Sequence, residues 1–286
     1  MDKHDNNNYS VVNTLRQTVP LLFLILALQP LKAEQAVRAE LYSLTQAVSP
    51  GRPFTLAVVL SMPDGWHTYW DNPGDAGMAT RFDWQAPEGC VLQAKQAPAP
   101  TRHTSAGMTS FIHEKEAIYF FDWISNEPPA DSVRFALDVD WLECREICRP
   151  GKARLTLALP IGEDSPGSQD AWLDLIERAE ARFPEPEWPF RTSIRVRGDE
   201  IRVRLPKSKN TMRIQDVDFF PLDEMTYDLS ETPILKQRRH DEEIRLFLLP
   251  QRDRNPSHFR GIIQYTVNTP TGDVSRQAFI HEPINP

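Results

Sequence analysis

Two cysteines four positions apart, Cys144 and Cys148, form a spacing that suits thiol–disulfide chemistry. In an extended strand their Cα atoms would lie about 13 Å apart, whereas a disulfide requires roughly 4.4–6.8 Å. The pair therefore lies on a turn or a single helical turn, or it is not bridged. A bridge across so short a loop removes little chain entropy, on the order of 2 kcal/mol. This weak constraint favours a redox switch over a structural bridge, which stays open as the alternative.

Charged residues flank both cysteines without a clear bias. Arg145 and Arg149 would favour a thiolate, whereas Glu143 and Glu146 would oppose it. The residues alone therefore leave open which cysteine is the nucleophile.

The third cysteine, Cys90, follows the turn sequence Pro87-Glu88-Gly89. An odd cysteine in an exported protein can pair with another molecule. We expect a buried or idle thiol here, with intermolecular pairing as the alternative.

Alternating apolar and polar residues predict that β-strands position the cysteine pair. The alternation is clear in Val133–Leu142, Phe54–Leu60 and Arg154–Leu159, and Ala117–Ile124 is a further apolar strand candidate. We therefore expect the cysteines in the connection between the strands Val133–Leu142 and Arg154–Leu159.

A helix and a second group of strands are expected after these elements. Ser168 can cap the helix, whose apolar face is formed by Trp172, Leu175, Ile176, Ala179 and Phe183. The stiff segment Pro184–Pro189 is typical of a linker, and Gly198-Asp199 indicates a hairpin. Further strands are expected over Ile244–Leu249, Gly261–Val267 and Val274–Ile280. The pattern predicts an all-β chain of two sandwiches joined by a short helix and a proline-rich linker.

The N-terminus has the features of an export signal. Val19–Leu31 is an apolar run too short to span a bilayer, which takes about 20 residues, and Ala33 offers a cleavage point. We predict a signal peptide over residues 1–33 and a periplasmic or otherwise exported mature protein, with an uncleaved or lipid-tethered anchor as the alternative. Export implies an oxidising compartment. The net charge of −8 argues against binding to nucleic acid or anionic membranes.

A second motif resembles a known family. Gly65–Gly77 reads Gly-Trp-His-Thr-Tyr-Trp-Asp-Asn-Pro-Gly-Asp-Ala-Gly. It resembles the signature of the N-terminal periplasmic region of DsbD-like thiol:disulfide interchange proteins, and within them the ScsB-type branch linked to suppression of copper sensitivity. The Cys-x-x-x-Cys-x-Pro-Gly segment Cys144–Gly151 resembles the redox pair of that family. The resemblance covers Ala36–Leu159 well and Arg191–Ile284 more loosely.

The resemblance implies a domain organisation and a role. It implies an immunoglobulin-like redox domain at 34–163, a helix and linker at 164–190, and a second immunoglobulin-like sandwich at 191–286. Cys144 and Cys148 would be the redox couple, with Cys148 attacking the partner, and this redox-active disulfide would take the place of a cofactor. Electrons would pass to periplasmic thioredoxin-fold proteins. Because such proteins usually continue into membrane helices, we expect either a separate membrane electron donor acting in trans or a truncated or diverged module.

Aromatic residues are expected around the disulfide. The candidates for its environment or cap are His67, Tyr69, Trp70, Phe111 and Trp141. Such a wall would restrict which thiols reach the bond. Ordinary core packing is the alternative for these aromatic residues. His67 could accept a proton near the thiols, and a structural, hydrogen-bonded histidine is the alternative.

Three other interpretations stay open. The chain could be a non-catalytic immunoglobulin-like binding or scaffold module with a structural disulfide. It could also be a copper-tolerance protein that binds metal through scattered soft ligands, namely Met62, Met78, Met108, His67, His103 and His113. Finally, the alternating arginines Arg195, Arg197, Arg202 and Arg204 form either a solvated basic face or a docking site for an acidic partner.

Overall fold

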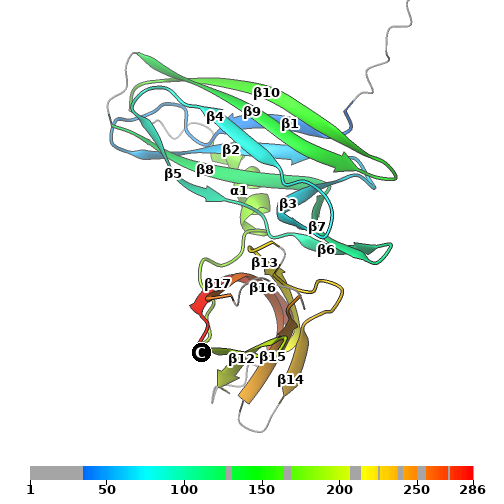
Figure 1. Cartoon of the computed structure of the whole chain (residues 1–286). Coiled ribbons are helices and arrows are strands. Elements are labelled where there is room, and N and C mark those ends of the chain that lie inside the picture. The colour runs from blue at the N-terminus through cyan, green and yellow to red at the C-terminus, as the bar shows by residue number, and fades with distance from the viewer. Residues whose placement is uncertain are drawn as a thin grey trace, which may run out of the picture. The chain divides into compact units, whose positions relative to one another are not determined.

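A computed structural model describes residues 35–126, 131–163, 169–206, 214–224, 226–237, 241–249, 256–269 and 271–285. The predicted signal peptide at 1–33 and the capping residue Ser168 lie outside these ranges. Residues 35–286 form one compact unit, which contains two β-sandwiches with separate apolar cores (Figure 1). In the described part of the chain, no helix combines the length and the apolar character needed to cross a membrane.

The first sandwich is formed by two antiparallel sheets. One sheet has the order β1 (Arg38–Ser43), β2 (Pro53–Ser61), β8 (Glu116–Ser125) and β5 (Cys90–Gln96). The other has the order β10 (Cys148–Pro160), β9 (Ser132–Cys144), β3 (His67–Gly74), β7 (Met108–Glu114) and β6 (Thr101–Ser105), with β4 (Arg81–Gln85) also paired to β9. The predicted alternation is confirmed, because the alternate residues Val133, Phe135, Leu137, Val139 and Trp141 of β9 are at most 1% exposed.

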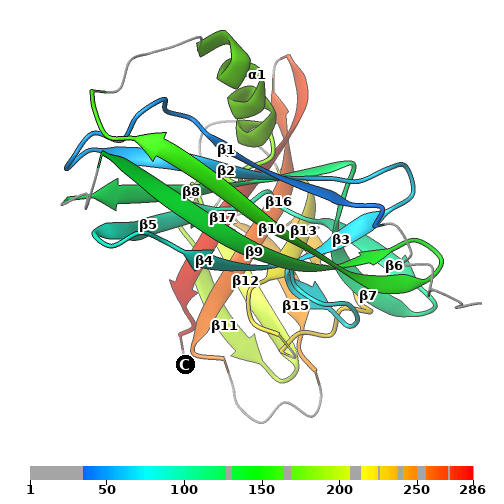
Figure 2. The ribbon, with the colours of Figure 1, turned by 90° about the horizontal axis from the view of Figure 1, so that it is seen from above.

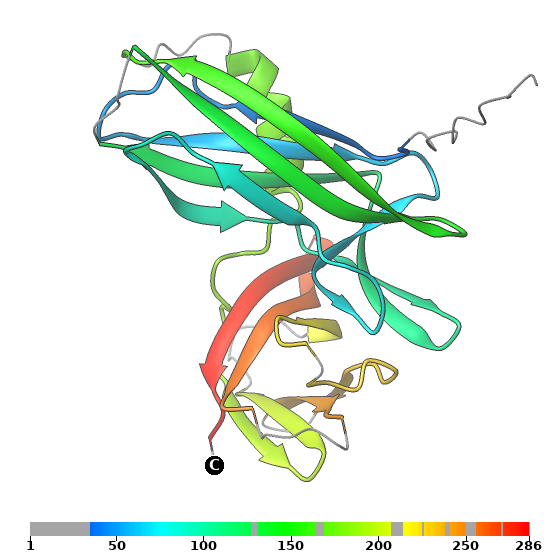
Figure 3. The same cartoon turned by 45° about the horizontal axis from the view of Figure 1, so that its top comes forward.

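Strands β9 and β10 form a long hairpin, drawn in green in Figure 3, that is more extended than the sequence predicted. Their register is continuous from Ser132 opposite Pro160 to Cys144 opposite Cys148. Pro150 is tolerated because β10 lies at the edge of its sheet. Gly151 is needed there, since a Cβ atom at this position would lie 2.2 Å from the indole nitrogen of Trp141. The cysteines therefore end the strands and do not lie inside a longer connection.

Helix α1 (Gln169–Glu180) covers the outer face of the first sheet. Leu175 and Ala179 are buried against Ala57 of β2 and Ile118 of β8, as the predicted apolar face requires. Figure 2 shows the helix beside β1 and β2. A ring contact between Tyr42 and Trp172, with centroids 5.9 Å apart, extends this packing.

The second sandwich pairs a four-stranded sheet with a three-stranded one. The first has the order β11 (Ser193–Arg197), β12 (Glu200–Pro206), β15 (Asp241–Phe247) and β14 (Ile234–Gln237), and the second has the order β13 (Ile214–Pro221), β16 (His258–Thr269) and β17 (Gly272–Pro283). The predicted hairpin is confirmed at Gly198, whose φ is 64°. The proline-rich segment contributes to this sandwich, because Trp188 packs in its core and Glu185 pairs with Ala278.

Candidate redox site

A disulfide joins Cys144 and Cys148 at the end of the β9–β10 hairpin. The two Cα atoms lie 4.1 Å apart because the cysteines are cross-strand partners, so the chain reverses within residues 145–147. The two sides of the bond differ in exposure: Cys144 is 2% exposed, whereas Cys148 is exposed. Thiol–disulfide exchange requires access to the sulfur that is attacked. Cys148 is therefore the more accessible of the two cysteines.

Tyr69 of β3 contacts both sulfurs. Its hydroxyl donates a hydrogen bond to the Sγ atom of Cys144 over 3.2 Å and lies 3.9 Å from the Sγ atom of Cys148. Burial raises the pKa of Tyr69, so the phenol stays protonated and remains a donor. Such a donor stabilises a thiolate on Cys144, which is the sulfur that leaves when Cys148 is attacked.

Gly77 explains how Tyr69 reaches this position. Its φ is 120°, a conformation that glycine adopts readily, and a Cβ atom there would lie 2.2 Å from the ring of Tyr69. The backbone therefore lies directly against the ring. The hydroxyl of Thr80 also donates to the carbonyl oxygen of Tyr69 over 3.3 Å. These contacts give the last glycine of the Gly65–Gly77 motif a physical function.

His67 lies on β3, opposite Cys144 of β9 in the strand register. Its ring contacts Tyr69, with centroids 5.4 Å apart, and the ring of His103 lies 5.5 Å away. Burial lowers the pKa of His67, the nearby His103 lowers it further, and Glu114 opposes this effect. A neutral imidazole therefore borders the site at neutral pH.

Trp70, Phe111 and Trp141 lie elsewhere in the structure. Trp70 and Phe111 form an edge-to-face pair with centroids 6.2 Å apart, buried in a cluster with Phe220. Trp141 lies in the core of the first sandwich. The segment Thr101–His113, which includes Phe111, contains β6 and most of β7. Cys144 is buried in a cluster with Tyr69, which was expected here, and with Ile112 and Leu142, which were not.

Sequence reasoning missed the most connected polar group of the site, Glu143. This carboxylate is fully buried and accepts hydrogen bonds from the backbone nitrogens of Ala36 and Val37 over 3.0 and 2.9 Å. It also accepts from the indole of Trp141 over 3.2 Å and from Nε of Arg149 over 2.6 Å. Burial by itself would raise the pKa of Glu143, but these hydrogen bonds lower it below its usual value. Glu143 therefore stays ionised beside the disulfide.

The hairpin tip presents both charge and apolar surface. Arg149 lies over the ring of Trp66, with its guanidinium carbon 4.7 Å from the ring centroid, while Arg145 and Glu146 are exposed. Ile147, the neighbour of Cys148, is 79% exposed. An apolar side chain this exposed beside an accessible sulfur suits contact with a protein surface.

Other chemical groups lie apart from this disulfide. Cys90 is a free, partly buried thiol at the start of β5, opposite Ser125 of β8, in the sheet that does not carry the disulfide. Among the described residues, no three His, Cys, Asp or Glu side chains are grouped to hold a metal ion.

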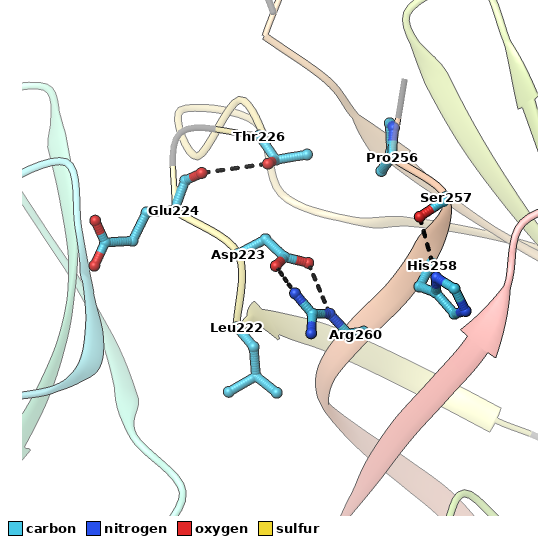
Figure 4. A pocket seen from close by; sticks show the side chains of 8 residues that line it. All are labelled: Leu222, Asp223, Glu224, Thr226, Pro256, Ser257, His258 and Arg260. Atoms are coloured by element: carbon cyan, nitrogen blue, oxygen red, sulfur yellow. Dashed lines mark hydrogen bonds and ion pairs between the residues drawn. The ribbon is translucent and has the colours of Figure 1, made fainter. Parts of the chain in front are cut away.

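A cavity of about 780 Å³ lies in the second sandwich, where Asp223 pairs with Arg260 and Ser257 contacts His258 (Figure 4). Ser257 and His258 are sequence neighbours, and the carboxylate of Asp223 binds Arg260. This arrangement does not provide a nucleophile with an oriented base.

The fold and the cysteine pair together define an all-β, immunoglobulin-like chain whose first sandwich carries a disulfide of unequal exposure. Residues 29–160 match the family model described as thiol:disulfide interchange protein DsbD, N-terminal. The first sandwich is therefore similar in sequence to the N-terminal domain of DsbD-like thiol:disulfide interchange proteins. Among curated proteins, none matches the sequence of this chain.

Comparison with solved structures gives one match that shares the fold and a weaker one. The N-terminal periplasmic domain of ScsB from Proteus mirabilis matches with a TM-score of 0.60 and 16% identity, over 90% of this chain and 97% of that one. The reduced N-terminal domain of DsbD from Neisseria meningitidis matches with a TM-score of 0.31 and 11% identity, over 45% of this chain and 90% of that one. The first match covers nearly the whole of both chains, so the fold is shared along the length of the chain.

Proposed function

We propose that this chain is a periplasmic thiol–disulfide exchange module that relays electrons through Cys144 and Cys148 to thioredoxin-fold partner proteins. The observation that carries the proposal is the asymmetry of the disulfide. Cys148 is exposed, whereas Cys144 is buried and accepts a hydrogen bond from Tyr69. The match of residues 29–160 to a thiol:disulfide interchange family supports the same chemistry.

The exchange proceeds through a mixed disulfide. In the reduced module, the Cys148 thiolate attacks one sulfur of the partner disulfide, that bond breaks, and the partner's second sulfur leaves as a thiolate that takes up a proton. The Cys144 thiolate then attacks the Sγ atom of Cys148. This step re-forms the intramolecular disulfide and releases the partner as a dithiol, so two electrons move to the partner. A donor dithiol, supplied by a separate membrane protein, restores the reduced module by the reverse steps.

The exposed hairpin tip is the contact surface in this proposal. Ile147 supplies apolar area beside the attacking sulfur. Replacing it by serine should slow exchange with a protein partner and leave reduction by dithiothreitol unchanged. A rate of exchange with the protein partner that is the same in Ile147→Ser and the wild type would show that the tip does not select partners.

Two measurements test the function. The reduction potential of the couple is measured by equilibration in glutathione buffers, and we expect roughly −180 to −270 mV. With an oxidised disulfide isomerase as partner, Cys144→Ser should accumulate a mixed disulfide and Cys148→Ser should not. A potential well below about −300 mV, together with unchanged exchange in both variants, would instead favour a scaffold module with a structural disulfide.

A further inference from the structure

The outer face of the four-stranded sheet in the second sandwich gathers arginines in cross-strand rows. Arg195 of β11 lies opposite Arg202 of β12, and Arg202 lies opposite Arg245 of β15. Figure 1 shows β12, β15 and β14 side by side in this sheet. Directly opposed like charges destabilise a sheet. Three opposed arginines therefore need nearby carboxylates or a bound anion to offset their repulsion.

Two carboxylates organise part of this face. Glu243 is fully buried and accepts from Nε of Arg204 over 3.0 Å and from Nε of Arg245 over 2.8 Å. Glu200 contacts Arg202 over 2.6 Å and Arg245 over 3.5 Å. These pairs hold the three guanidinium groups in defined orientations, which lowers the entropy lost when a ligand binds them.

Arg195 and Arg197 differ from the other arginines of this face. Both are exposed, and no carboxylate contacts either guanidinium in the described part of the chain. They line a groove of about 130 Å³ together with Ser193, Arg202 and Arg204. All five residues belong to the β11–β12 hairpin, whose backbone groups form a strand ladder. Guanidinium groups and a serine hydroxyl are therefore the groups that this groove presents to an anion. Neither a helix N-terminus nor a glycine-rich loop is among its five lining residues.

We propose that this arginine groove docks an extended acidic segment of a partner polypeptide. The spacing favours this ligand, because arginines two positions apart on a strand are separated by about 6.6 Å, the spacing of alternate side chains in an extended peptide. Planar guanidinium groups also bind carboxylates in a two-pronged geometry. The second sandwich has no cysteine, so it cannot exchange disulfides itself. The role of the groove in this proposal is to recognise the partner, while thiol exchange takes place in the first sandwich.

The test uses fluorescence anisotropy with a labelled peptide of alternating glutamate and threonine, and a glutamine–threonine peptide as the neutral control. The wild-type chain should bind the acidic peptide, and raising the salt concentration should weaken binding. Arg195→Gln/Arg197→Gln should raise the Kd about tenfold, since each exposed charge pair contributes up to about 1 kcal/mol and 1.4 kcal/mol is a factor of ten. The control Arg38→Gln/Arg52→Gln removes the same charge from exposed positions of the first sandwich and should leave the Kd unchanged.

Several results would overturn the proposal. Equal weakening in both double variants would show a general charge effect, and an unchanged Kd in Arg195→Gln/Arg197→Gln would show that the groove is not the site. Displacement of the peptide by inorganic phosphate at equal concentration would identify a phosphate site. Binding to phosphatidylglycerol vesicles without binding to the peptide would identify a lipid surface. Reduction of Cys144–Cys148 by dithiothreitol should be the same in all variants, so this test is separate from that of the exchange function.

Discussion

Glu143 and Arg149 lie opposite each other in the β9–β10 hairpin, directly beside the Cys144–Cys148 disulfide, and their side chains are joined over 2.6 Å. The ion pair links the strand that carries one cysteine to the strand that carries the other. It does not depend on the disulfide, so it can hold the two thiols close together after reduction. Closeness of the thiols favours re-formation of the bond.

Replacing Glu143 by glutamine should therefore weaken the disulfide. Glutamine removes the ionised acceptor of the Arg149 guanidinium, whose side chain is 32% exposed, and loss of a charged hydrogen bond costs about 1.5–3 kcal/mol of folding free energy. We expect a lower free energy of unfolding and a shift of the glutathione equilibrium toward the dithiol. Both are measured on the purified chain, by urea unfolding and by thiol alkylation. The control Arg154→Gln removes an exposed ion pair to Asp138 in the same hairpin and should change neither quantity much. An unchanged equilibrium in Glu143→Gln would contradict the positioning role.

Replacing Tyr69 by phenylalanine should slow exchange without unfolding the domain. The variant loses only the hydroxyl that donates to Cys144. A hydrogen bond of this kind contributes about 1 kcal/mol, so we expect a roughly fivefold slower reduction by dithiothreitol and a higher pKa of the Cys144 thiol in the reduced form. Stopped-flow reduction across a pH series measures both. Tyr42→Phe, on the helix side of the first sandwich, is the matched control. Equal rates in Tyr69→Phe and the wild type would show that the hydroxyl does not assist the leaving sulfur.

The strands that carry the site could be predicted because their burial alternates locally along the sequence. The alternation that places Phe135 and Leu137 in the core is visible without any tertiary information. The ion pair of Glu143 with Arg149 was missed because the register of the hairpin was unknown. One signal was present, since these residues flank the two cysteines symmetrically, and a disulfide-closed hairpin must bring them together.

The aromatic residues that we expected around the disulfide show a second limit of prediction from the sequence. Tyr69 and Trp70 are consecutive on β3, and consecutive side chains of a strand point to opposite faces of the sheet. Only one of them could cover the sulfurs, and the structure places Tyr69 there and Trp70 beside Phe111. Leu142 shares β9 with Cys144 and lies two residues from it, so it is on the same face of the strand. Ile112 comes from β7, and its position depends on sheet order, which the sequence did not determine.

Replacing Gly77 by alanine should displace the ring of Tyr69, because the added Cβ would lie 2.2 Å from the ring. Gly107 is a matched control: its φ is also positive, at 80°, but a Cβ atom there meets nothing within 4 Å. Both variants should lose about 1 kcal/mol of stability from backbone strain. Only Gly77→Ala should also slow dithiothreitol reduction, to at least the extent seen for Tyr69→Phe. Equal reduction rates for the two glycine variants would show that Gly77 serves the backbone alone.

His113 should make the fold sensitive to mild acid. Its ring is fully buried next to Tyr119, and neither ring nitrogen has a hydrogen-bond partner among the described residues. Burial, with smaller contributions from Arg182 and Lys95, lowers the pKa of His113 to about 3. An unfolded histidine has a pKa of about 6.5. Below that pH the unfolded chain therefore binds a proton that the folded chain does not bind, and stability falls as the pH falls toward 3.

His113→Leu removes this titration and the two unpaired nitrogens. Between pH 7 and pH 5, above the range where most carboxylates protonate, the wild type should lose about 2 kcal/mol of unfolding free energy because of His113. Urea unfolding at the two pH values should show this loss in the wild type and in the control His281→Gln, which alters an exposed histidine of β17. In His113→Leu the loss should be smaller by that amount. Parallel losses in all three proteins would mean that His113 does not control the acid sensitivity of the fold.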